Sequence, residues 1–166
     1  MLTSLVGSEM CIRDSVELGG KSAAVVLPDA DIDKVVNATK VGIFSQAGQI
    51  CSAMSRMIVH KSIKDEVLEK LSKLAASIKV GPGDEEGVDL TPVISEDQLQ
   101  KVENYARSGL QAGAKAVSGG NRVDRKGFFF EPTIYSDVKP DMTIAQEEIF
   151  GPFLSVLDYE DHEEAI

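Results

Sequence analysis

The sequence predicts a layered α/β domain with a mostly parallel, twisted sheet flanked by helices. Short apolar runs of strand length alternate with longer amphipathic stretches of helix length, and glycine or proline marks the junctions between them. The chain has 166 residues, of which 43% are apolar, and this is enough for one domain with its own core. We therefore expect a single unit in which helices cover the sheet.

The first predicted strand is the valine-containing run Ser22 to Leu27, which Pro28 ends, and its composition suits a buried strand. A helix follows, with Asp29 or Asp31 as its N-terminal cap and Gly48 as its end. Its apolar stripe, at three- and four-residue spacing, consists of Ile32, Val35, Val36, Thr39 and Ile43.

The second predicted strand covers Arg56 to His60. Ser62 and Asp65 approximate a capping box for a long helix that runs to about Ile78, and residues 80–84 form a glycine–proline loop. The buried face of this helix is predicted to consist of Val67, Leu68, Leu71, Leu74, Ala75 and Ile78.

A third helix is predicted to begin after Ser95, with Gln98 completing its capping box and Gly113 ending it. Its apolar stripe consists of Leu99, Val102, Tyr105, Ala106 and Leu110. The remaining predicted strands are Ala114 to Val117, Phe128 to Tyr135 and Phe153 to Tyr159, with a loop from Gly119 to Lys126. Pro132 interrupts the second of these, which places that residue at an edge or bulge.

The two ends of the chain differ from the patterned sequence between them. Residues 1–15 show neither strand alternation nor a helical stripe and resemble translated sequencing-adapter DNA, so we expect a non-native leader there and the domain in residues 16–166. A natural disordered arm is the less favoured alternative, because such arms are richer in charge and proline. At the other end, Asp161 caps a helix that stops at Ile166 with no room to bury a face, which indicates a truncated domain.

The composition disfavours nucleic acid, membranes and metals as partners. Acidic residues outnumber basic ones 27 to 17, giving a net charge of −10, and the two kinds interleave through residues 61–79. Apolar runs fall short of the roughly 18 residues of a membrane span. Cys11 and Cys51 are too few for a secreted disulfide scaffold, and His60 and His162 are too scattered for a zinc site. We expect a cytoplasmic protein without a metal.

Cys51 is the candidate nucleophile. It follows a predicted helix in the turn Gly48-Gln49-Ile50-Cys51-Ser52, whose small residues can leave a thiol exposed. A thiolate is a strong nucleophile where backbone N–H groups or a cation stabilise it. On these residues alone, a buried structural cysteine remains the alternative.

Three segments of the chain together resemble signatures of the aldehyde dehydrogenase superfamily. They read VELGGK at residues 16–21, GQIC at 48–51 and QEEIFGP at 146–152. Their order matches the family, as do the separations of 34 residues from Glu17 to Cys51 (51 − 17) and 97 from Cys51 to Glu148 (148 − 51). The resemblance covers Val16 to Ile166.

The resemblance implies a catalytic-domain-like fold, truncated here, and a role for each matching residue. Cys51 would attack the aldehyde, and Glu17 would be the general base that hydrolyses the resulting thioester. NAD or NADP would be the cofactor, with Glu148 accepting hydrogen bonds from the nicotinamide ribose, Phe150 packing beside the ring and the Leu18 carbonyl facing its amide. The partners would be a small-molecule aldehyde and further copies of the parent protein in a homodimer or homotetramer.

The resemblance also implies limits and leaves alternatives open. The family's N-terminal dinucleotide-binding domain, an oxyanion-binding asparagine and the C-terminal tail are absent from the sequence, so this chain alone should show little turnover. The alternatives are a non-catalytic family member or interaction module, and a cysteine hydrolase or acyltransferase that uses His60. Ile50 and residues 51–56 look similar to members that act on betaine aldehyde and aminoaldehydes.

Overall fold

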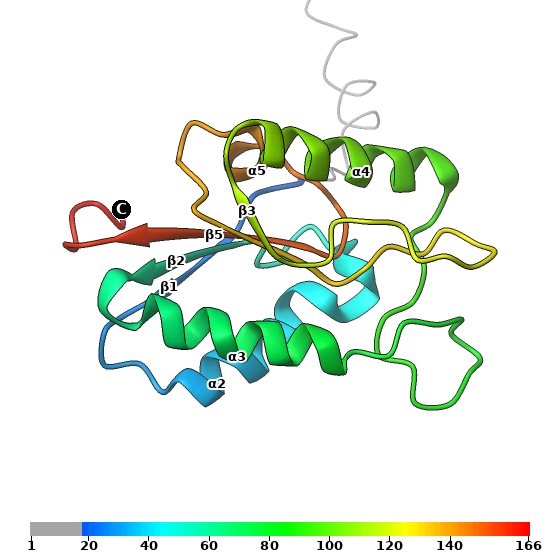
Figure 1. Ribbon diagram of the computed structural model, residues 1–166, viewed down its shortest axis with the longest axis horizontal. Coiled ribbons are helices and arrows are strands. Elements are labelled where there is room, and N and C mark those ends of the chain that lie inside the picture. Colours follow the sequence, from blue (N-terminus) through cyan, green and yellow to red (C-terminus); the bar gives the residue numbers. More distant parts are fainter. Residues whose placement is uncertain (1–17) are drawn as a thin grey trace, which may run out of the picture.

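The computed structural model describes residues 18–166, so the expected leader and Glu17 lie outside the described part (Figure 1). In chain order the strands and α-helices are β1 (Ala23–Val26), α2 (Ile32–Thr39), β2 (Arg56–His60), α3 (Lys64–Ser77), α4 (Glu96–Gln111), β3 (Lys115–Ser118), β4 (Thr133–Ser136), α5 (Thr143–Gln146) and β5 (Phe153–Tyr159). None of the helices within residues 18–166 combines the length and apolar character that crossing a membrane requires.

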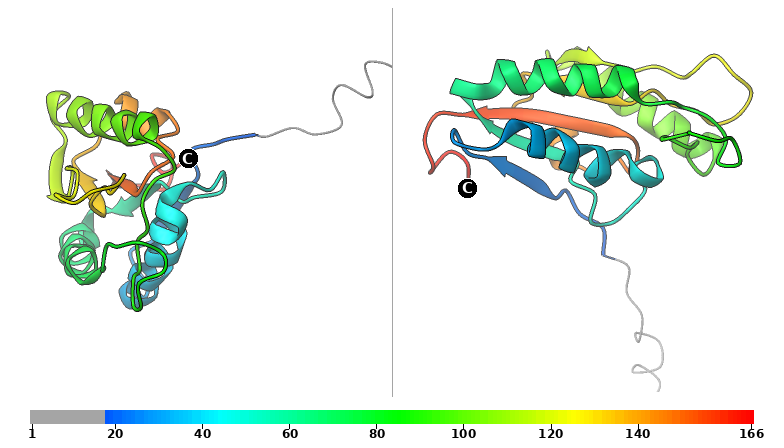
Figure 2. Two further views of the ribbon diagram at one scale, coloured as in Figure 1. Left: turned by 90° about the vertical axis from the view of Figure 1, so that its right-hand side faces the viewer. Right: turned by 90° about the horizontal axis from the view of Figure 1, so that it is seen from below.

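The strands form one sheet in the order β1-β2-β5-β4-β3. The pairings β1–β2, β2–β5 and β5–β4 are parallel, and only β3 runs antiparallel to its neighbour β4. Helices α4 and α5 lie on one side of the sheet and α2 and α3 on the other, as two further views also show (Figures 1 and 2). The predicted layered fold with a mostly parallel sheet is confirmed.

Strand β1 forms where it was predicted, but the prediction that it is buried is wrong. Of its four residues only Val26 is buried, while Val25 is 49% exposed and the following Leu27 is 44% exposed. The reason is position in the sheet, because β1 is an edge strand that pairs only with β2 among the described strands.

The predicted first helix has three parts. Asp31, rather than Asp29, caps α2 by accepting a hydrogen bond from the backbone N–H of Lys34 at 3.2 Å. After Thr39 the chain widens into a π-helix (Lys40–Phe44) and then tightens into a 3-10 turn (Ser45–Gly48). The prediction of one regular helix up to Gly48 is therefore wrong, because the regular α-helix ends at Thr39 and Gln46 and Ala47 do not have helical backbone angles.

The predicted cap of helix α3 is also wrong. A 3-10 turn (Lys61–Ile63) precedes the helix, and the His60 ring accepts a hydrogen bond from the Ser62 backbone N–H at 3.2 Å. The Ser62 hydroxyl contacts the same ring and caps nothing, because Ile63 is the N-cap residue. The predicted inner face is confirmed, with Val67, Leu71, Ala75 and Ile78 buried and Leu68 and Leu74 packed against them.

Helix α4 has the predicted N-cap but only half of the predicted capping box. The Ser95 hydroxyl accepts from the Gln98 N–H at 3.2 Å, whereas the Gln98 side chain points to a different segment, described below. Leu110, predicted to be buried, is 50% exposed, because Gly109 takes the inward position of that turn. Gly113, with a φ of 100°, follows the helix as predicted.

The C-terminal part of the chain follows the prediction, except that β3 and β4 begin later than predicted and the last predicted helix does not form. β3 begins one residue later than predicted, and β5 has the predicted bounds. The strand predicted from residue 128 begins only after Pro132, because proline lacks the N–H that a ladder needs. Asp161 does cap the backbone N–H groups of Glu163 and Glu164, at 3.0 and 3.2 Å, but residues 162–165 form a turn and not a helix.

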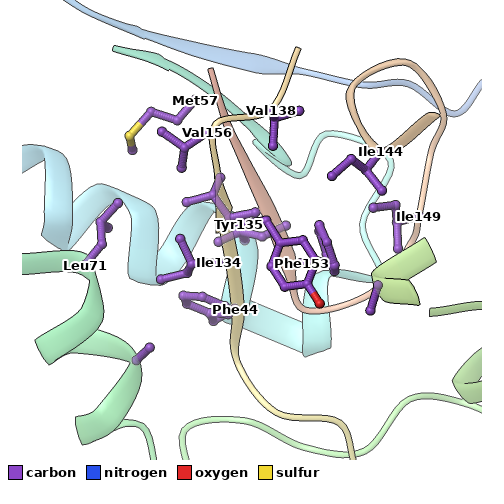
Figure 3. Packing of buried hydrophobic residues seen from close by; sticks show 14 of the residues in the cluster. Phe44, Met57, Leu71, Ile134, Tyr135, Val138, Ile144, Ile149, Phe153 and Val156 are labelled. Carbon is purple, nitrogen blue, oxygen red and sulfur yellow. The ribbon is translucent and has the colours of Figure 1, made fainter. Parts of the chain in front are cut away.

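The core lies on both faces of β4 and β5, whose residues are almost all buried (Figure 3). The rings of Tyr135 and Phe153 pack at a centroid distance of 4.8 Å. The buried Tyr159 hydroxyl donates to the carbonyl oxygen of Val26 at 3.2 Å and ties β5 to β1. These contacts fix the strands relative to one another, and so fix the segments that enter them.

Candidate active site

Each of the three segments singled out in the sequence enters a parallel strand. Residues 18–22 lead into β1, residues 49–55 into β2 and residues 147–152 into β5. Since these strands are neighbours and run in the same direction, the three segments meet at the amino-terminal edge of the sheet. The candidate site therefore lies where the strands begin.

The turn that carries Cys51 has an unusual backbone. Gln46, Ala47 and Gly48 have positive φ angles of 49°, 55° and 68°, directly after the π-helix. π-Helical segments and left-handed non-glycine residues are costly and are found preferentially at functional sites. Cys51 follows in an exposed turn with a free thiol.

The side-chain amide of Gln49 connects this turn to the segment before helix α4. Its Oε1 accepts a hydrogen bond from the backbone N–H of Ile94 at 2.9 Å, and its Nε2 donates to the carbonyl oxygen of Gln46 at 3.2 Å. Ile94 directly precedes the N-cap residue of α4. The turn is therefore attached to the beginning of that helix.

Two close backbone approaches join the segments. A Cβ at Gly48 would overlap the carbonyl oxygen of Gly151, so the Cys51 turn packs against the end of the 147–151 segment through two glycines. A Cβ built on Gly20 would lie 3.8 Å from the carbonyl oxygen of Cys51. The backbone beside Cys51 thus contacts both of the other segments.

Glu147 and Glu148 point to different neighbours. The Glu148 carboxylate accepts a hydrogen bond from the Gly20 N–H at 3.2 Å, and it packs so closely on Gly19 that a Cβ there would overlap it. The Glu147 carboxylate accepts from the Tyr105 hydroxyl of α4 at 2.7 Å. This alternation places Glu148 beside the glycine pair that follows Leu18.

Phe150 is half-buried and has a φ of 57°, which is rare for an aromatic residue. The side-chain amide of Gln98 donates to the carbonyl oxygens of Ile149 and Phe150 at 2.9 and 2.7 Å. Leu18 is 76% exposed, so its side chain is not part of the core. The sequence did not identify this role of Gln98, because a glutamine three residues after a serine also fits a capping box.

Lys21, the last residue of the VELGGK segment, is a further charged residue at this end of the sheet, and the sequence suggested no role for it. Burial, and after it the neighbouring Arg56, lower the pKa of Lys21 to about 8, although Glu148 and Glu147 act in the opposite direction. Within the described part of the chain, neither Lys21 Nζ nor Arg56 Nε has a hydrogen-bond partner, and both atoms are buried. The cluster consists of two cations beside two carboxylates.

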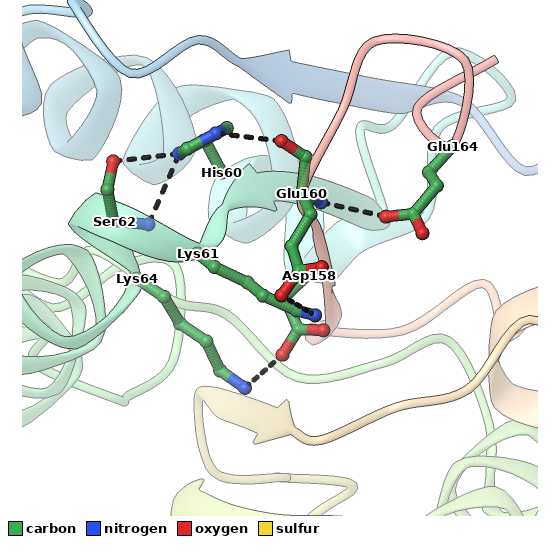
Figure 4. Close-up of polar contacts among 7 residues, drawn as sticks. All are labelled: His60, Lys61, Ser62, Lys64, Asp158, Glu160 and Glu164. Carbon is green, nitrogen blue, oxygen red and sulfur yellow. Dashed lines mark hydrogen bonds and ion pairs between the residues drawn. The ribbon is translucent and has the colours of Figure 1, made fainter.

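Both histidines lie at the opposite, carboxyl-terminal edge of the sheet. His60 is the last residue of β2, and its ring contacts the Ser62 hydroxyl at 2.7 Å and the Glu160 carbonyl oxygen at 3.1 Å (Figure 4). His162 is exposed, three residues after the end of β5. β2 separates His60 from Cys51, so the two cannot act as a nucleophile–base pair.

A hollow of about 470 Å³ opens on α4 next to Glu147. Its lining includes Lys101, Tyr105, Thr143 and Glu147. Cys51 is not part of this lining, so Glu147 is the residue that the hollow shares with the three segments. Within residues 18–166, no three His, Cys, Asp or Glu side chains are grouped to hold a metal ion.

The chain is similar throughout to aldehyde dehydrogenases. The model of the aldehyde dehydrogenase family matches residues 3–166. A mitochondrial aldehyde dehydrogenase of Leishmania tarentolae is 44% identical over 152 residues, and a peroxisomal aminoaldehyde dehydrogenase of Pisum sativum is 49% identical over 154. Each alignment covers 92% of this chain, but only 30% and 31% of the relative.

Solved structures show the same likeness. The NAD+ complex of an aldehyde dehydrogenase from Bacillus cereus superposes with a TM-score of 0.86 at 42% identity. A betaine aldehyde dehydrogenase from Staphylococcus aureus in complex with NAD+ gives 0.86 at 39%. Both matches cover 90% of this chain and 30% of the solved one, so the chain spans about a third of the relatives it resembles.

Proposed function

Because the chain belongs to the aldehyde dehydrogenase family, we propose that its parent protein oxidises a small-molecule aldehyde to a carboxylic acid with NAD or NADP, and that Cys51 is the nucleophile. One observation carries the proposal. The exposed Cys51 turn, the Leu18–Gly20 segment and the Glu148–Phe150 segment meet at one edge of the sheet. Covalent catalysis needs such convergence of a nucleophile with binding groups from distant parts of the chain.

The residues present fit a nicotinamide nucleotide. Glu148 accepts one hydrogen bond from Gly20, which leaves acceptor capacity on its two oxygens for the hydroxyl pair of a ribose. Phe150 is only half-buried, so part of its ring remains free to pack beside a planar group. Leu18 would turn its backbone carbonyl to the carboxamide. When bound, the nucleotide accepts the hydride that the reacting carbon gives up.

Cys51 and Glu17 divide the remaining chemistry. The Cys51 thiolate attacks the carbonyl carbon, and the Cys51 backbone N–H helps to stabilise the oxyanion of the thiohemiacetal. Loss of hydride leaves a thioester. Glu17 then removes a proton from a water molecule, which attacks the thioester carbonyl, and collapse of the adduct releases the acid and restores the Cys51 thiolate. Support for Glu17 comes from its place in the chain, directly before the segment that contacts Cys51 and Glu148.

The proposal extends to substrate class, assembly and location. Relatives are named for different substrates, among them aminoaldehydes and betaine aldehyde. The substrate proposed for the parent protein is therefore the class these share, a small aldehyde. The net charge of −10 disfavours nucleic acid as a partner, and a homodimer or homotetramer is proposed for the parent protein. A cytoplasmic location is proposed from the free Cys51 thiol, although relatives are named mitochondrial and peroxisomal.

We expect Cys51→Ser in the full-length parent protein to lower NAD- or NADP-dependent oxidation of propanal by at least about a thousandfold. The serine hydroxyl is a far weaker nucleophile at neutral pH. The measurement is NADH or NADPH absorbance, and Cys11→Ser is the matched control, expected to keep the wild-type rate. A Cys51→Ser protein that turns over normally would instead establish a non-catalytic role for this cysteine.

We expect Glu17→Gln to separate the two half-reactions. Acylation does not need the base, so one equivalent of NADH per site should form rapidly, and later turnovers should slow by about 10² to 10⁴ because hydrolysis has lost its base. Rapid-mixing absorbance resolves the two phases. Slow NADH formation in a single phase, without a burst, would reject Glu17 as the base for hydrolysis.

A further inference from the structure

The beginning of helix α4 contacts both of the backbone turns that form the candidate site. The Ile94 N–H, two residues before the helix, donates to the Gln49 side chain at 2.9 Å. Gln98, in the first turn, donates to the carbonyl oxygens of Ile149 and Phe150 at 2.9 and 2.7 Å. Two segments separated by about a hundred residues are thus attached to one helical turn, each through a glutamine side chain.

We propose that Gln49 and Gln98 are positioning residues that hold the Cys51 turn and the Glu148–Phe150 turn at a fixed separation on the N-terminal end of α4. We name this arrangement the glutamine clamp. It rests on the proposed function in that the two turns carry the nucleophile and the cofactor-binding groups. The clamp is closed on its third side by the backbone contact between Gly48 and Gly151.

The chemistry of each contact requires an amide. Gln49 accepts at Oε1 and donates at Nε2, to the main chain at Ile94 and Gln46 respectively. Gln98 donates two hydrogens to two carbonyl oxygens, which a carboxylate cannot do because it only accepts. Replacing either amide by a carboxylate of nearly the same shape therefore removes the donated hydrogen bonds and sets oxygen against oxygen.

The backbone of both turns, the Cys51 turn and the Glu148–Phe150 turn, is strained and needs stabilising contacts from outside the turn. Gln46, Ala47 and Phe150 have φ angles of 49°, 55° and 57°, a region in which residues with a Cβ are strained. Such a backbone persists only where surrounding contacts determine it. The clamp supplies one such contact to each strained turn, directly on the carbonyl of Gln46 and on the carbonyl of Phe150.

The two glutamines act on different sides of the reaction, which makes the proposal testable. Gln98→Glu moves the turn that carries Glu148 and Phe150, so in the full-length enzyme the KM for NAD+ should rise about tenfold with a smaller change in kcat. Gln49→Glu moves the Cys51 turn. It should lower kcat and the rate of Cys51 alkylation by iodoacetamide about tenfold, with a KM for NAD+ within about twofold of wild type.

A merely structural role would give a different result. General destabilisation lowers the concentration of active enzyme, so Vmax falls while the KM of the surviving molecules is unchanged. Gln111→Glu, at the exposed far end of α4, is the matched control and should alter neither constant. For Gln98→Glu, lowering the pH to about 5 should partly restore the KM, because the protonated introduced carboxyl can donate one hydrogen bond.

The proposal is overturned if Gln98→Glu leaves the KM for NAD+ unchanged and Gln49→Glu leaves the rate of Cys51 alkylation unchanged. Failure of the proposed function is a separate outcome, in which the wild-type full-length protein reduces no NAD+ or NADP+. The clamp is then judged on this 166-residue chain by amide hydrogen exchange. Gln98→Met should speed exchange at least fivefold in residues 149–153, and Gln49→Met in residues 46–51; protection equal to wild type in both would reject the clamp.

Discussion

Lys21 carries an ammonium group that is buried beside Arg56 and next to the carboxylates of Glu147 and Glu148. Burial is the largest cause that lowers the pKa of Lys21, to about 8 from its ordinary value of 10.5. The charged form is therefore disfavoured in the folded protein relative to the unfolded chain. A cation held against this cost beside Glu148 neutralises part of the carboxylate charge at the site.

The pKa of Lys21 predicts how stability depends on pH. Between about pH 8 and 10.5 the unfolded chain keeps a proton that the folded protein has lost, so the free energy of unfolding rises with pH through this window. Relative to Lys21→Met, the wild type should gain about 2 kcal/mol between pH ~7.5 and ~9.5. Urea unfolding of both proteins at the two pH values measures the difference.

The variant comparison cancels the titration of tyrosines and other lysines that are common to both proteins. Lys139→Met, at an exposed position, is the control, and its difference from wild type should not change over the same range. A constant difference for Lys21→Met as well would mean that Lys21 Nζ is solvated in the folded state.

At the scale of single residues, the sequence pointed to the candidate catalytic and cofactor-binding residues, but not to the residues that hold them in place through hydrogen bonds to distant main-chain groups. Cys51, Glu148 and Phe150 stand in recognisable segments, and the structure brings these segments together at one edge, although their roles remain proposals. Gln49 and Gln98 bind main-chain groups far away in the chain. No local pattern encodes such a partner, because any backbone carbonyl or N–H looks alike in sequence.

At the scale of elements, the period of apolar residues predicted most helices and strands, and departures from regular geometry were missed. The π-helix Lys40–Phe44 keeps an apolar inner face, with Ile43 and Phe44 buried, so its pattern reads as ordinary α-helix. β4 is shorter than its apolar run because Pro132 removes a ladder hydrogen bond. Both departures depend on backbone hydrogen bonds, which hydrophobic periodicity does not report.

The contact between the Cys51 turn and the β5 entry segment predicts a large cost for a side chain at Gly48. Gly48→Ala meets two penalties, a left-handed backbone at φ 68° and overlap with the Gly151 carbonyl oxygen. Gly87→Ala is the matched control, since Gly87 has a φ of 75° with nothing within 4 Å of an added Cβ. Gly87→Ala should cost about 1 kcal/mol, and Gly48→Ala about 2 kcal/mol or more beyond that.

Denaturant unfolding measures both costs. Since the overlap lies between the two site segments, Gly48→Ala should also change the rate at which iodoacetamide alkylates Cys51, in a Cys11→Ser background. Equal losses of stability for the two glycine variants would mean that the chain relaxes around Gly48 and that the contact does not hold the segments together.

At the scale of the whole molecule, the fold class and the strand direction followed from alternation of helices and strands, whereas the order β1-β2-β5-β4-β3 did not. Strand order decides burial, which explains the error at β1: an apolar run alone does not say whether its strand is central, as β5 is, or at the edge, as β1 is. The same order decides the site, because it sets β1, β2 and β5 side by side and gathers their entry segments.

The exposed edge at β1 predicts that this chain self-associates at high concentration. Among residues 18–166, β1 pairs on one side only, with β2, and the apolar side chains of Val25 and Leu27 are exposed. Such an edge strand is a template for pairing with another strand. Val25→Lys places a charge on that edge and should shift the chain toward monomer, as measured by sedimentation velocity over a concentration series.

Val41→Lys is the matched control, because it makes the same change at a residue that is 68% exposed but lies on the π-helix, away from the edge. If Val41→Lys reduces association as much as Val25→Lys, general hydrophobicity drives it; if only Val25→Lys does so, the strand edge is the contact surface.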